Sequence, residues 1–293
     1  MKEIIVLSSK NYIDSESCNY GDCFIINTGS KLFIYDCGSE EHANRVIDYM
    51  DKNGYEEATI VLSHNDADHF NGIPTLIDNK RVSAIYTTLL LKQEHLDKII
   101  ERIDDDRKTR ESVKEEILEE YDNIASLSGN NLNDIYLDTC DLPNELKIVG
   151  PDLEYMLDTV AKNLDGREGN SVDKETAINA TSIQLAIEIC GHNLLLCGDC
   201  SFAAIEDVIK DYDVIQLPHH GKSEQAENIF ENKSNDVRTI YIVSDNTGST
   251  NGGSDDLKTT GHIIHITKKE GDITINSTFF SDNNPHTRRT LGK

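Results

Sequence analysis

The sequence predicts an α/β fold in which two β-sheets pack together and helices cover their outer faces. Short apolar, β-branched segments alternate with helical ones along the chain, and they fall into two halves that each run from strands to helices. Polar residues gather where the apolar segments end, which is where α/β folds place their chemistry. The 293 residues suffice for one large domain or two small ones, and no low-complexity linker divides them.

The first 90 residues predict four strands and one long helix. A Thr-Gly-Ser turn between two apolar segments is typical of a hairpin. The expected strands are residues 3–8, 23–27, 31–35 and 58–63. The expected helix ends at Asn53-Gly54 and has an apolar face formed by Val46, Ile47 and Met50. The last of these strands leads directly into His64.

Residues 92–127 predict two amphipathic helices separated by a run of charged residues. Their apolar residues repeat at the spacing i, i+3, i+4, i+7 or close to it. These residues are Leu96, Ile99, Ile100 and Ile103 in the first helix, and Val113, Ile117, Tyr121 and Ile124 in the second. Two interpretations stay open: a lid or partner-binding arm, or a surface helical hairpin that covers a face of a sheet.

The second half predicts further strands, most of them short. Alternating apolar residues over 182–190 are followed by an expected turn at His192-Asn193 and a strand over 194–197. A helix is expected over 202–210. The remaining expected strands lie near Ile135 and at residues 147–149, 213–217, 239–244, 263–267 and 272–276.

Charge and composition narrow the function. The chain has 28 basic and 53 acidic residues, and the resulting net charge of −25 repels a polyanion such as nucleic acid. Its apolar runs fall far short of the ~20 residues that span a bilayer. The seven cysteines, an odd number without a secretory signal, indicate reduced thiols. We therefore expect a cytoplasmic protein that does not enter a membrane.

The strongest chemical signal follows the expected strand 58–63. Four of six consecutive residues can bind a metal, namely His64, Asp66, Asp68 and His69. Imidazole suits zinc and similar ions, whereas carboxylates favour harder ones. Any one of these side chains alone would be read as a turn cap or a surface residue, but a loop leaving a buried strand can direct all four into one pocket.

Two later strand ends carry similar side chains. Gly198-Asp199 follows the apolar strand 194–197, and Pro218-His219-His220-Gly221 follows the strand 213–217. Three strand ends that each deliver metal-binding groups are a recurring arrangement in dinuclear hydrolases.

These motifs resemble the metallo-β-lactamase superfamily, and within it the soluble hydrolase domains of the ComEC group, over most of the chain. The matching segments are Gly21-Asp22, Asp36-Cys37-Gly38, His64 to Gly72, Asn179 to Ser182, Gly198-Asp199 and Pro218 to Gly221. The resemblance implies one domain over residues 1–293 with a four-layer αβ/βα sandwich, in which residues 92–127 form a helical insertion. It also implies a site for two metal ions at one edge.

The resemblance further implies which residues hold the metals. His64 and Asp66 would bind one ion; Asp68, His69 and either His219 or His220 would bind the other; and Asp199 would bridge both. The superfamily's usual loop has histidine where Asp66 stands, and its usual third-motif histidine is absent here. The first site is therefore expected to be richer in oxygen and to bind zinc more weakly, which favours manganese there or the loss of that ion. The expected cofactors are two divalent ions, Zn or Mn, or one ion only.

Three further residues are candidates for binding the substrate. Asn179 and Ser182 occupy the region where the superfamily carries its third-motif histidine. Lys222 stands where the ComEC-like domains usually carry serine, and it would either bind a phosphate oxygen or point to solvent.

The expected activity is that of a metal-dependent hydrolase, a phosphodiesterase or nuclease. Two cations make hydroxide available near neutral pH and absorb charge that develops on the substrate oxygen. Asp68 would orient the attacking water, and whichever of His219 and His220 is not a ligand would contact the substrate or protonate the leaving group. The acidic charge fits a small nucleotide or phosphoester better than nucleic acid. The alternatives are hydrolysis of an ester, lactone or thioester, and a non-catalytic metal-binding module that recruits a protein partner through helices 92–127.

Overall fold

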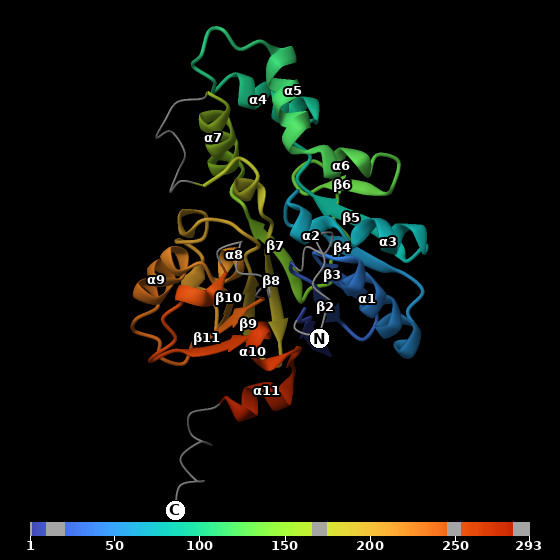
Figure 1. Ribbon diagram of the computed structural model, residues 1–293, viewed down its shortest axis with the longest axis vertical. Coiled ribbons are helices and arrows are strands. Elements are labelled where there is room, and N and C mark those ends of the chain that lie inside the picture. Colours follow the sequence, from blue (N-terminus) through green and yellow to red (C-terminus); the bar gives the residue numbers. More distant parts are fainter. Residues whose placement is uncertain (1, 10–20, 166–174, 245–252, 284–293) are drawn as a thin grey trace, which may run out of the picture.

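The computed structural model describes residues 2–9, 21–165, 175–244 and 253–283. Within them, a seven-stranded and a six-stranded β-sheet face each other, and helices lie on both outer sides (Figure 1). The predicted α/β sandwich of four layers, helix–sheet–sheet–helix, is confirmed.

The first sheet has the strand order β13-β1-β2-β3-β4-β5-β6. Its bounds are β1 Glu3–Val6, β2 Phe24–Asn27, β3 Leu32–Tyr35, β4 Ala58–Val61, β5 Val82–Thr87, β6 Leu132–Asp134 and β13 Ile273–Ile275. The predicted hairpin is present as β2 and β3, which pair antiparallel from Phe24 opposite Tyr35. The strands from β3 to β6 are parallel. The late strand β13 returns to this sheet and pairs with β1.

The second sheet has the order β12-β11-β10-β9-β8-β7. Its bounds are β7 Leu146–Gly150, β8 Gln184–Ile189, β9 His192–Leu196, β10 Val214–Gln216, β11 Ile240–Val243 and β12 Ile263–Ile266. The strands β9, β10, β11 and β12 are parallel neighbours, whereas β7, β8 and β9 pair antiparallel.

Two details of this half differ from the sequence prediction. The turn between β8 and β9 is Cys190-Gly191 rather than His192-Asn193, because Cys190 and Gly191 both take positive φ (53° and 78°), as a tight two-residue hairpin requires. The expected helix over 202–210 is two short 3₁₀ turns, Phe202–Ala204 and Ile209–Asp211. These turns bury Ile205 and Ile209 in the core outside the second sheet, so packing overrides the helical spacing.

The main core lies between the two sheets. In β2, Phe24 and Ile26 point into this core, whereas Ile25 belongs to the cluster under the outer helices. Every residue of β2 and β3 is therefore buried, as expected for strands that are covered on both faces. The hydroxyl of Tyr35 donates to the carbonyl of Ile183 at 2.6 Å and links the two sheets near the site.

Helices α1 and α3 cover the first sheet, and α9 covers the second (Figure 1). The helices outside residues 92–127 are α1 Glu40–Asn53, α2 Ala67–Phe70, α3 Ile73–Asp78, α7 Leu153–Leu164, α8 Pro218–Gly221, α9 Ser223–Asn232, α10 Thr267–Glu270 and α11 Ser277–Asp282. As predicted, α1 buries Val46 and Met50 and ends at Gly54, which takes a left-handed φ of 75°.

Residues 92–127 form three helices rather than two. They are α4 Gln93–Ile100, α5 Arg110–Glu120 and α6 Asp122–Ser126. The second predicted helix is broken at Tyr121 (φ −114°), whose side chain is buried and whose hydroxyl donates to Thr181 Oγ1 at 2.5 Å. The predicted apolar positions are buried at Leu96, Ile99, Val113, Ile117, Tyr121 and Ile124, and partly buried at Ile100 and Ile103.

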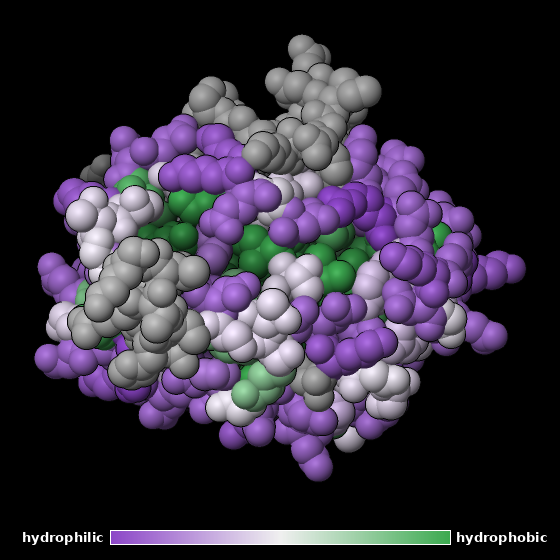
Figure 2. Space-filling view, turned by 90° about the horizontal axis from the view of Figure 1, so that it is seen from below, coloured by the Kyte–Doolittle hydropathy of each residue, from purple (hydrophilic) through white to green (hydrophobic). Residues whose placement is uncertain are grey.

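One end of the molecule is largely hydrophilic. Figure 2 shows the end of the molecule that lies away from α4 and α5, with hydrophilic residues around a hollow in which hydrophobic ones are visible. No helix among the described residues is both long and apolar enough to cross a bilayer. Six of the seven cysteines lie in the described ranges, and all six are free thiols.

His42 predicts a specific acid sensitivity. It is fully buried in α1, and burial lowers its pKa to about 3, with nearby Arg45 adding to the shift. In the unfolded chain the imidazole of His42 has a pKa near 6.5. Between about pH 6.5 and 3, this residue therefore binds one proton in the unfolded chain and none in the folded chain. Because of His42, stability is therefore lost as the pH falls below 6.5. In His42→Leu, we expect the unfolding free energy to fall less steeply, by up to about 1.4 kcal/mol per pH unit. Urea unfolding from pH 7 to 4.5 measures both slopes, and equal slopes would contradict the assignment.

Candidate metal centre

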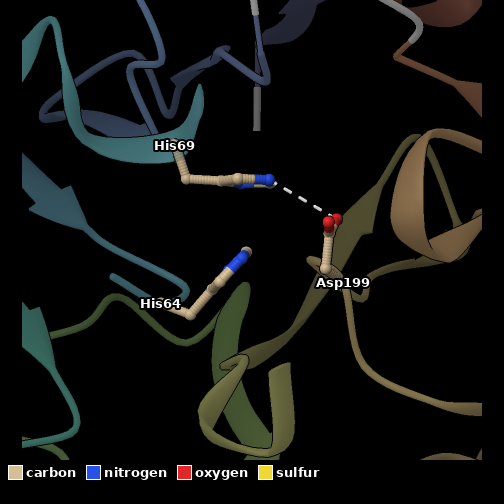
Figure 3. Close-up of side chains that lie close together, drawn as sticks. All are labelled: His64, His69 and Asp199. Atoms are coloured by element: carbon tan, nitrogen blue, oxygen red, sulfur yellow. Dashed lines mark ion pairs between the residues drawn. The ribbon is translucent and has the colours of Figure 1, made fainter. Parts of the chain in front are cut away.

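The predicted metal-binding residues meet at one edge of the sandwich, where β4, β9 and β10 end. His64 follows β4, Asp199 follows β9, and His220 follows β10. Because β4 belongs to one sheet and β9 and β10 to the other, the site lies between the two sheets. Figure 3 shows His64 and Asp199, from two of these loops, and His69, from α2, directed toward one another.

The first cluster consists of His64, His69 and Asp199. One ligand atom of each lies within 4.8 Å of the others, and Nε2 of His69 is 3.4 Å from Oδ1 of Asp199. Both imidazoles are completely buried and Asp199 is 5% exposed. Neither imidazole Nε2 nor Asp199 Oδ1 makes a hydrogen bond within the described residues. Buried polar atoms are rarely left in this state, so the cluster is suited to a bound ion.

The second cluster shares His69 and adds Asp68 and His220. Nε2 of His220 lies 3.0 Å from Asp68 Oδ2 and 3.8 Å from Asp199 Oδ2. His219 differs from its neighbour, because its side chain is 29% exposed and its Nδ1 lies 3.7 Å from Asp199 Oδ2. The geometry therefore distinguishes two adjacent histidines that the sequence left open: His220 lies among the ligand atoms and His219 at their rim.

The other predicted site residues lie around these clusters. Asp66 is 45% exposed, with Oδ2 3.4 Å from His64 Nε2. Asn179 is nearly buried and its Nδ2 is 3.3 Å from Nδ1 of His219. Lys222 is exposed. Ser182 differs from its expected substrate-binding role, because it is completely buried and its hydroxyl accepts a hydrogen bond from the backbone N–H of Asp199 (3.2 Å).

Asp36 fixes the orientation of the first cluster from the side opposite to its ligand atoms. Its carboxylate is completely buried and accepts three hydrogen bonds: from the backbone N–H of Ser63 (2.6 Å), from the Ser63 hydroxyl (2.7 Å) and from Nδ1 of His69 (2.8 Å). Since the Ser63 hydroxyl donates to Asp36, it accepts from Nδ1 of His64 at 2.8 Å. These bonds leave Nε2 of both histidines facing the site, which is the usual outer-shell arrangement for histidine ligands.

Behind the second cluster, the carbonyl of Ser244 accepts a hydrogen bond from Nδ1 of His220 at 3.0 Å, and the same nitrogen faces Asp22. Oδ1 of Asp22 lies 3.2 Å from Nδ1 of His220, and its Oδ2 accepts from Nε2 of Gln216 at 3.0 Å. Oε1 of Gln216 in turn accepts from the backbone N–H of Cys197 (2.7 Å), in the turn that carries Asp199. Gln216 therefore joins the loops that supply the two clusters.

The charges of the site are mutually dependent. Burial alone would lower the pKa values of His69 and His220, but the surrounding carboxylates, Asp199 foremost, raise both well above their usual range. Burial likewise opposes ionisation of Asp68 and Asp199, yet the neighbouring imidazoles hold the pKa of both carboxyls below the usual range. The buried carboxylates thus require positive charge nearby, which divalent cations supply at metal sites.

The backbone is constrained where the ligands are presented. His219, His220 and Gly221 take consecutive left-handed conformations (φ 54°, 53° and 81°), so the segment labelled α8 is a left-handed turn that separates the two rings. Non-glycine residues rarely adopt this conformation, and it is concentrated at functional sites. Gly38 allows a close approach, because a Cβ there would lie 1.9 Å from the carbonyl oxygen of Asp68.

The donor set fits divalent transition metals. Imidazole nitrogens and carboxylate oxygens are the ligands that zinc and manganese share, and both kinds are present in each cluster. The shared His69 and the central position of Asp199 place the two clusters side by side, an arrangement that suits one ion or a pair. The identity and number of ions stay predictions.

A pocket of about 530 Å³ adjoins this centre. Asp66, Asn179 and His219 line it on the metal side, and carboxylates of α5 line it elsewhere. The helical segment is attached to the metal loop by Asn65: its Nδ2 donates to the carbonyl of Glu120 (2.5 Å), and its Oδ1 accepts from the N–H of Ile124 (2.8 Å). The 92–127 segment is thus part of the wall of the site.

Asn65→Ala is expected to weaken this attachment. The change leaves a buried N–H and a carbonyl without partners, which costs about 2–3 kcal/mol of unfolding free energy. Limited proteolysis should then cut residues 92–127 faster, and urea unfolding should shift to lower concentration. Asn123→Ala is the matched control, since it removes only one bond, from Asn123 Nδ2 to the Asn65 carbonyl (2.9 Å). Equal behaviour of the two variants would show that Asn65 does not anchor the segment.

Sequence reasoning missed several residues of the site. Asp22 and Asp36 stood in quoted motifs but received no role, and Gln216 is a polar residue inside a buried strand. That strand position was the available signal for Gln216. Nothing local indicated that Asn65 bonds the backbone of α5 and α6, or that carboxylates of α5 line the same pocket as Asp66, because both depend on how the 92–127 segment folds back.

Comparisons with known proteins agree with this geometry. Residues 17–114 match the family model of the metallo-beta-lactamase superfamily. Among solved structures, Tm1679, a metal-dependent hydrolase of the beta-lactamase superfamily, is 15% identical with a TM-score of 0.51, over 94% of this chain and 99% of that one. Igni18, a novel metallo hydrolase from the hyperthermophilic archaeon Ignicoccus hospitalis KIN4/I, is 11% identical with a TM-score of 0.50, over 94% and 99%. No curated protein sequence matches. At these identities the likeness shows the fold.

Proposed function

We propose, from the metallo-β-lactamase fold and the site at its edge, that this protein is a metal-dependent hydrolase. One ion would be bound by His64, His69 and Asp199, with Asp66 at the edge of its site. A second ion would be bound by Asp68 and His220, and either His69 or Asp199 would complete its site. The observation that carries the proposal is the first cluster, in which three buried ligand atoms lie together without hydrogen bonds to any residue that the structure describes.

We further propose a small phosphodiester as the substrate class. Two adjacent ligand clusters support this choice, because paired cations stabilise both the attacking and the leaving oxygen in phosphoryl displacement. The net charge of −25 supports a small molecule over nucleic acid. The resemblance of the motifs to ComEC-like domains adds support for phosphodiester chemistry. Hydrolysis of an ester, lactone or thioester is the alternative on the same centre.

Each residue of the site would have a role that follows from its position. Metal ions, when bound, lower the pKa of water and take up charge on the substrate oxygen. Asp68, whose Oδ2 lies 3.0 Å from Nε2 of His220, would bind a metal and also orient the attacking water by accepting a hydrogen bond from it. His219 lines the pocket and faces the substrate rather than the ions. Burial lowers the pKa of His219, so its ring is uncharged at neutral pH and contacts the substrate as a hydrogen-bonding group.

The test is metal analysis combined with two model substrates. We expect freshly purified protein to carry up to two Zn, Mn or Fe ions, and to hydrolyse bis-p-nitrophenyl phosphate faster than p-nitrophenyl acetate. Chelation should abolish the activity and added Zn or Mn should restore it. Faster hydrolysis of the acetate would contradict the phosphodiester proposal and favour carboxyl esters as the substrate class. Failure to bind either metal in a titration would overturn the hydrolase proposal.

The partner and location predictions remain proposals. A protein partner bound through helices 92–127 has one supporting observation, the 43% exposure of Leu118 on α5. The attachment of this segment to Asn65 favours a role in the pocket instead. A cytoplasmic location stays a prediction of the sequence.

A further inference from the structure

The pocket beside the metal centre has an acidic side. Glu116, Glu119 and Glu120 of α5 line it together with Asp66, whose Oδ2 lies 3.4 Å from Nε2 of His64. Glu116 is neutralised by Lys108, whose Nζ lies 2.6 Å from both of its carboxylate oxygens. Within the described residues, Glu119 and Glu120 form no ion pair. An acidic wall repels the anionic groups that the metal centre would attract, so it calls for a ligand of the opposite charge.

The position of Glu119 and Glu120 in α5 does not favour helix stability. They occupy its last turn, which contains no basic residue. The negative end of the helix dipole disfavours carboxylates there. Burial raises the pKa of Glu120, and Glu116 and Asp66 add to that shift. Two carboxylates kept at an unfavourable place on a pocket wall point to a role in binding.

A second observation on the same wall points to a ligand. Asn179 lines the pocket and is 7% exposed. Its Nδ2 lies beside His219, but its amide oxygen accepts no hydrogen bond from the described residues. An amide oxygen that faces a pocket without a donor is suited to an N–H group of a ligand. Leu164, Ala177 and Ile178 make another part of the lining apolar, as a short hydrocarbon linker would require.

We propose, on the premise of the hydrolytic function above, that the substrate carries an amine cation away from the bond that is cleaved. Glu119 and Glu120 attract this ammonium, Asn179 accepts one of its hydrogen bonds, and the metal centre takes the phosphoryl or ester group. The 92–127 segment is then the specificity element of the enzyme. This arrangement selects a zwitterionic small molecule and rejects polyanions.

Two isosteric phosphonates test this proposal without turnover. 3-Aminopropylphosphonate and butylphosphonate differ only in an ammonium in place of a methyl group, and their C–P bonds are not hydrolysed. Calorimetry on the metal-loaded protein gives both dissociation constants. We expect the amino compound to bind about 3–10-fold more tightly, the range for one or two partly exposed charge pairs. The ratio should shrink as ionic strength rises.

Glu119→Gln/Glu120→Gln should bring this ratio close to one. The matched control is Glu111→Gln/Glu115→Gln, which removes the same charge from exposed positions of α5 outside the pocket lining. Equal affinities in the wild type, or the same ratio in both double variants, would overturn the proposal. So would the loss of one metal ion per chain in Glu119→Gln/Glu120→Gln, since the carboxylates would then hold a metal.

Butylammonium separates this proposal from the proposed reaction. If neither phosphonate binds the metal-loaded protein, the phosphoryl specificity fails, and butylammonium alone then tests the pocket. Binding that the Glu119→Gln/Glu120→Gln variant abolishes would keep the amine site. No binding would overturn it.

Discussion

Asp199→Ala is expected to lower hydrolysis about a thousandfold or more, which corresponds to about 4 kcal/mol of transition-state stabilisation. Asp199 belongs to the first cluster, and its oxygens approach histidines of both clusters: Oδ1 is 3.4 Å from Nε2 of His69, and Oδ2 is 3.8 Å from Nε2 of His220. In the proposed centre, removing it would take a ligand from each ion and leave less negative charge to hold the ions. Metal content should fall in parallel, by at least one ion if two are present.

Mass spectrometry of metals and initial rates measure this result side by side. Asp207→Ala is the control, because Asp207 is an exposed carboxylate a short distance along the same chain segment. An Asp199→Ala protein that keeps its full metal content and rate would remove Asp199 from the centre. Loss of activity with full metal content would instead make it a residue that acts on the substrate.

Much of the fold could be predicted because its signals are local. Apolar alternation and turn residues located the strands around the site, and Gly54 marked the end of α1. The same local logic placed His64 and Asp199 at strand ends, where the structure brings them together. A residue that follows a strand can be recognised from its order in the sequence, even when the strand boundary is predicted one or two positions away from its true place.

What could not be predicted depends on contacts between distant residues. The pairing of β13 with β1 joins residues more than 260 positions apart, for example Ile4 with Ile275. The difference between His219 and His220 comes from three consecutive left-handed residues, which no spacing rule reveals. The break at Tyr121 follows from its bond to Thr181, sixty residues away. The helical spacing of apolar residues in the sequence continues past Tyr121 and therefore does not reveal the break.

The same limit explains why the supporting residues were missed. A carboxylate such as Asp36 has no sequence signal of its role, because its three donors lie 27 and 33 residues further along the chain. Ser182 was assigned to the substrate for its position in a motif, whereas burial turns its hydroxyl toward the backbone of Asp199. Ligand types can be recognised from the sequence, but the residues that orient them are identified only in the folded chain.

Asp36→Asn is expected to be the most destabilising conservative change near the site. Asparagine tolerates the positive φ of this position (57°), so backbone strain does not contribute. The amide keeps one acceptor oxygen but places an NH₂ group against donors from Ser63 and His69. Breaking a buried charged network in this way costs about 3–5 kcal/mol of unfolding free energy.

Loss of this network should also weaken metal binding. Without its bond to Asp36, the His69 ring loses the restraint that directs Nε2 toward Asp199, and metal affinity should fall about 10–100-fold. Urea unfolding and a competitive zinc titration measure the two effects separately. Asp48→Asn, an exposed carboxylate on α1, should change neither. If Asp36→Asn unfolds like the wild type but binds zinc weakly, Asp36 serves only to orient His69; if both stay unchanged, the hydrogen-bond network is not what holds the centre together.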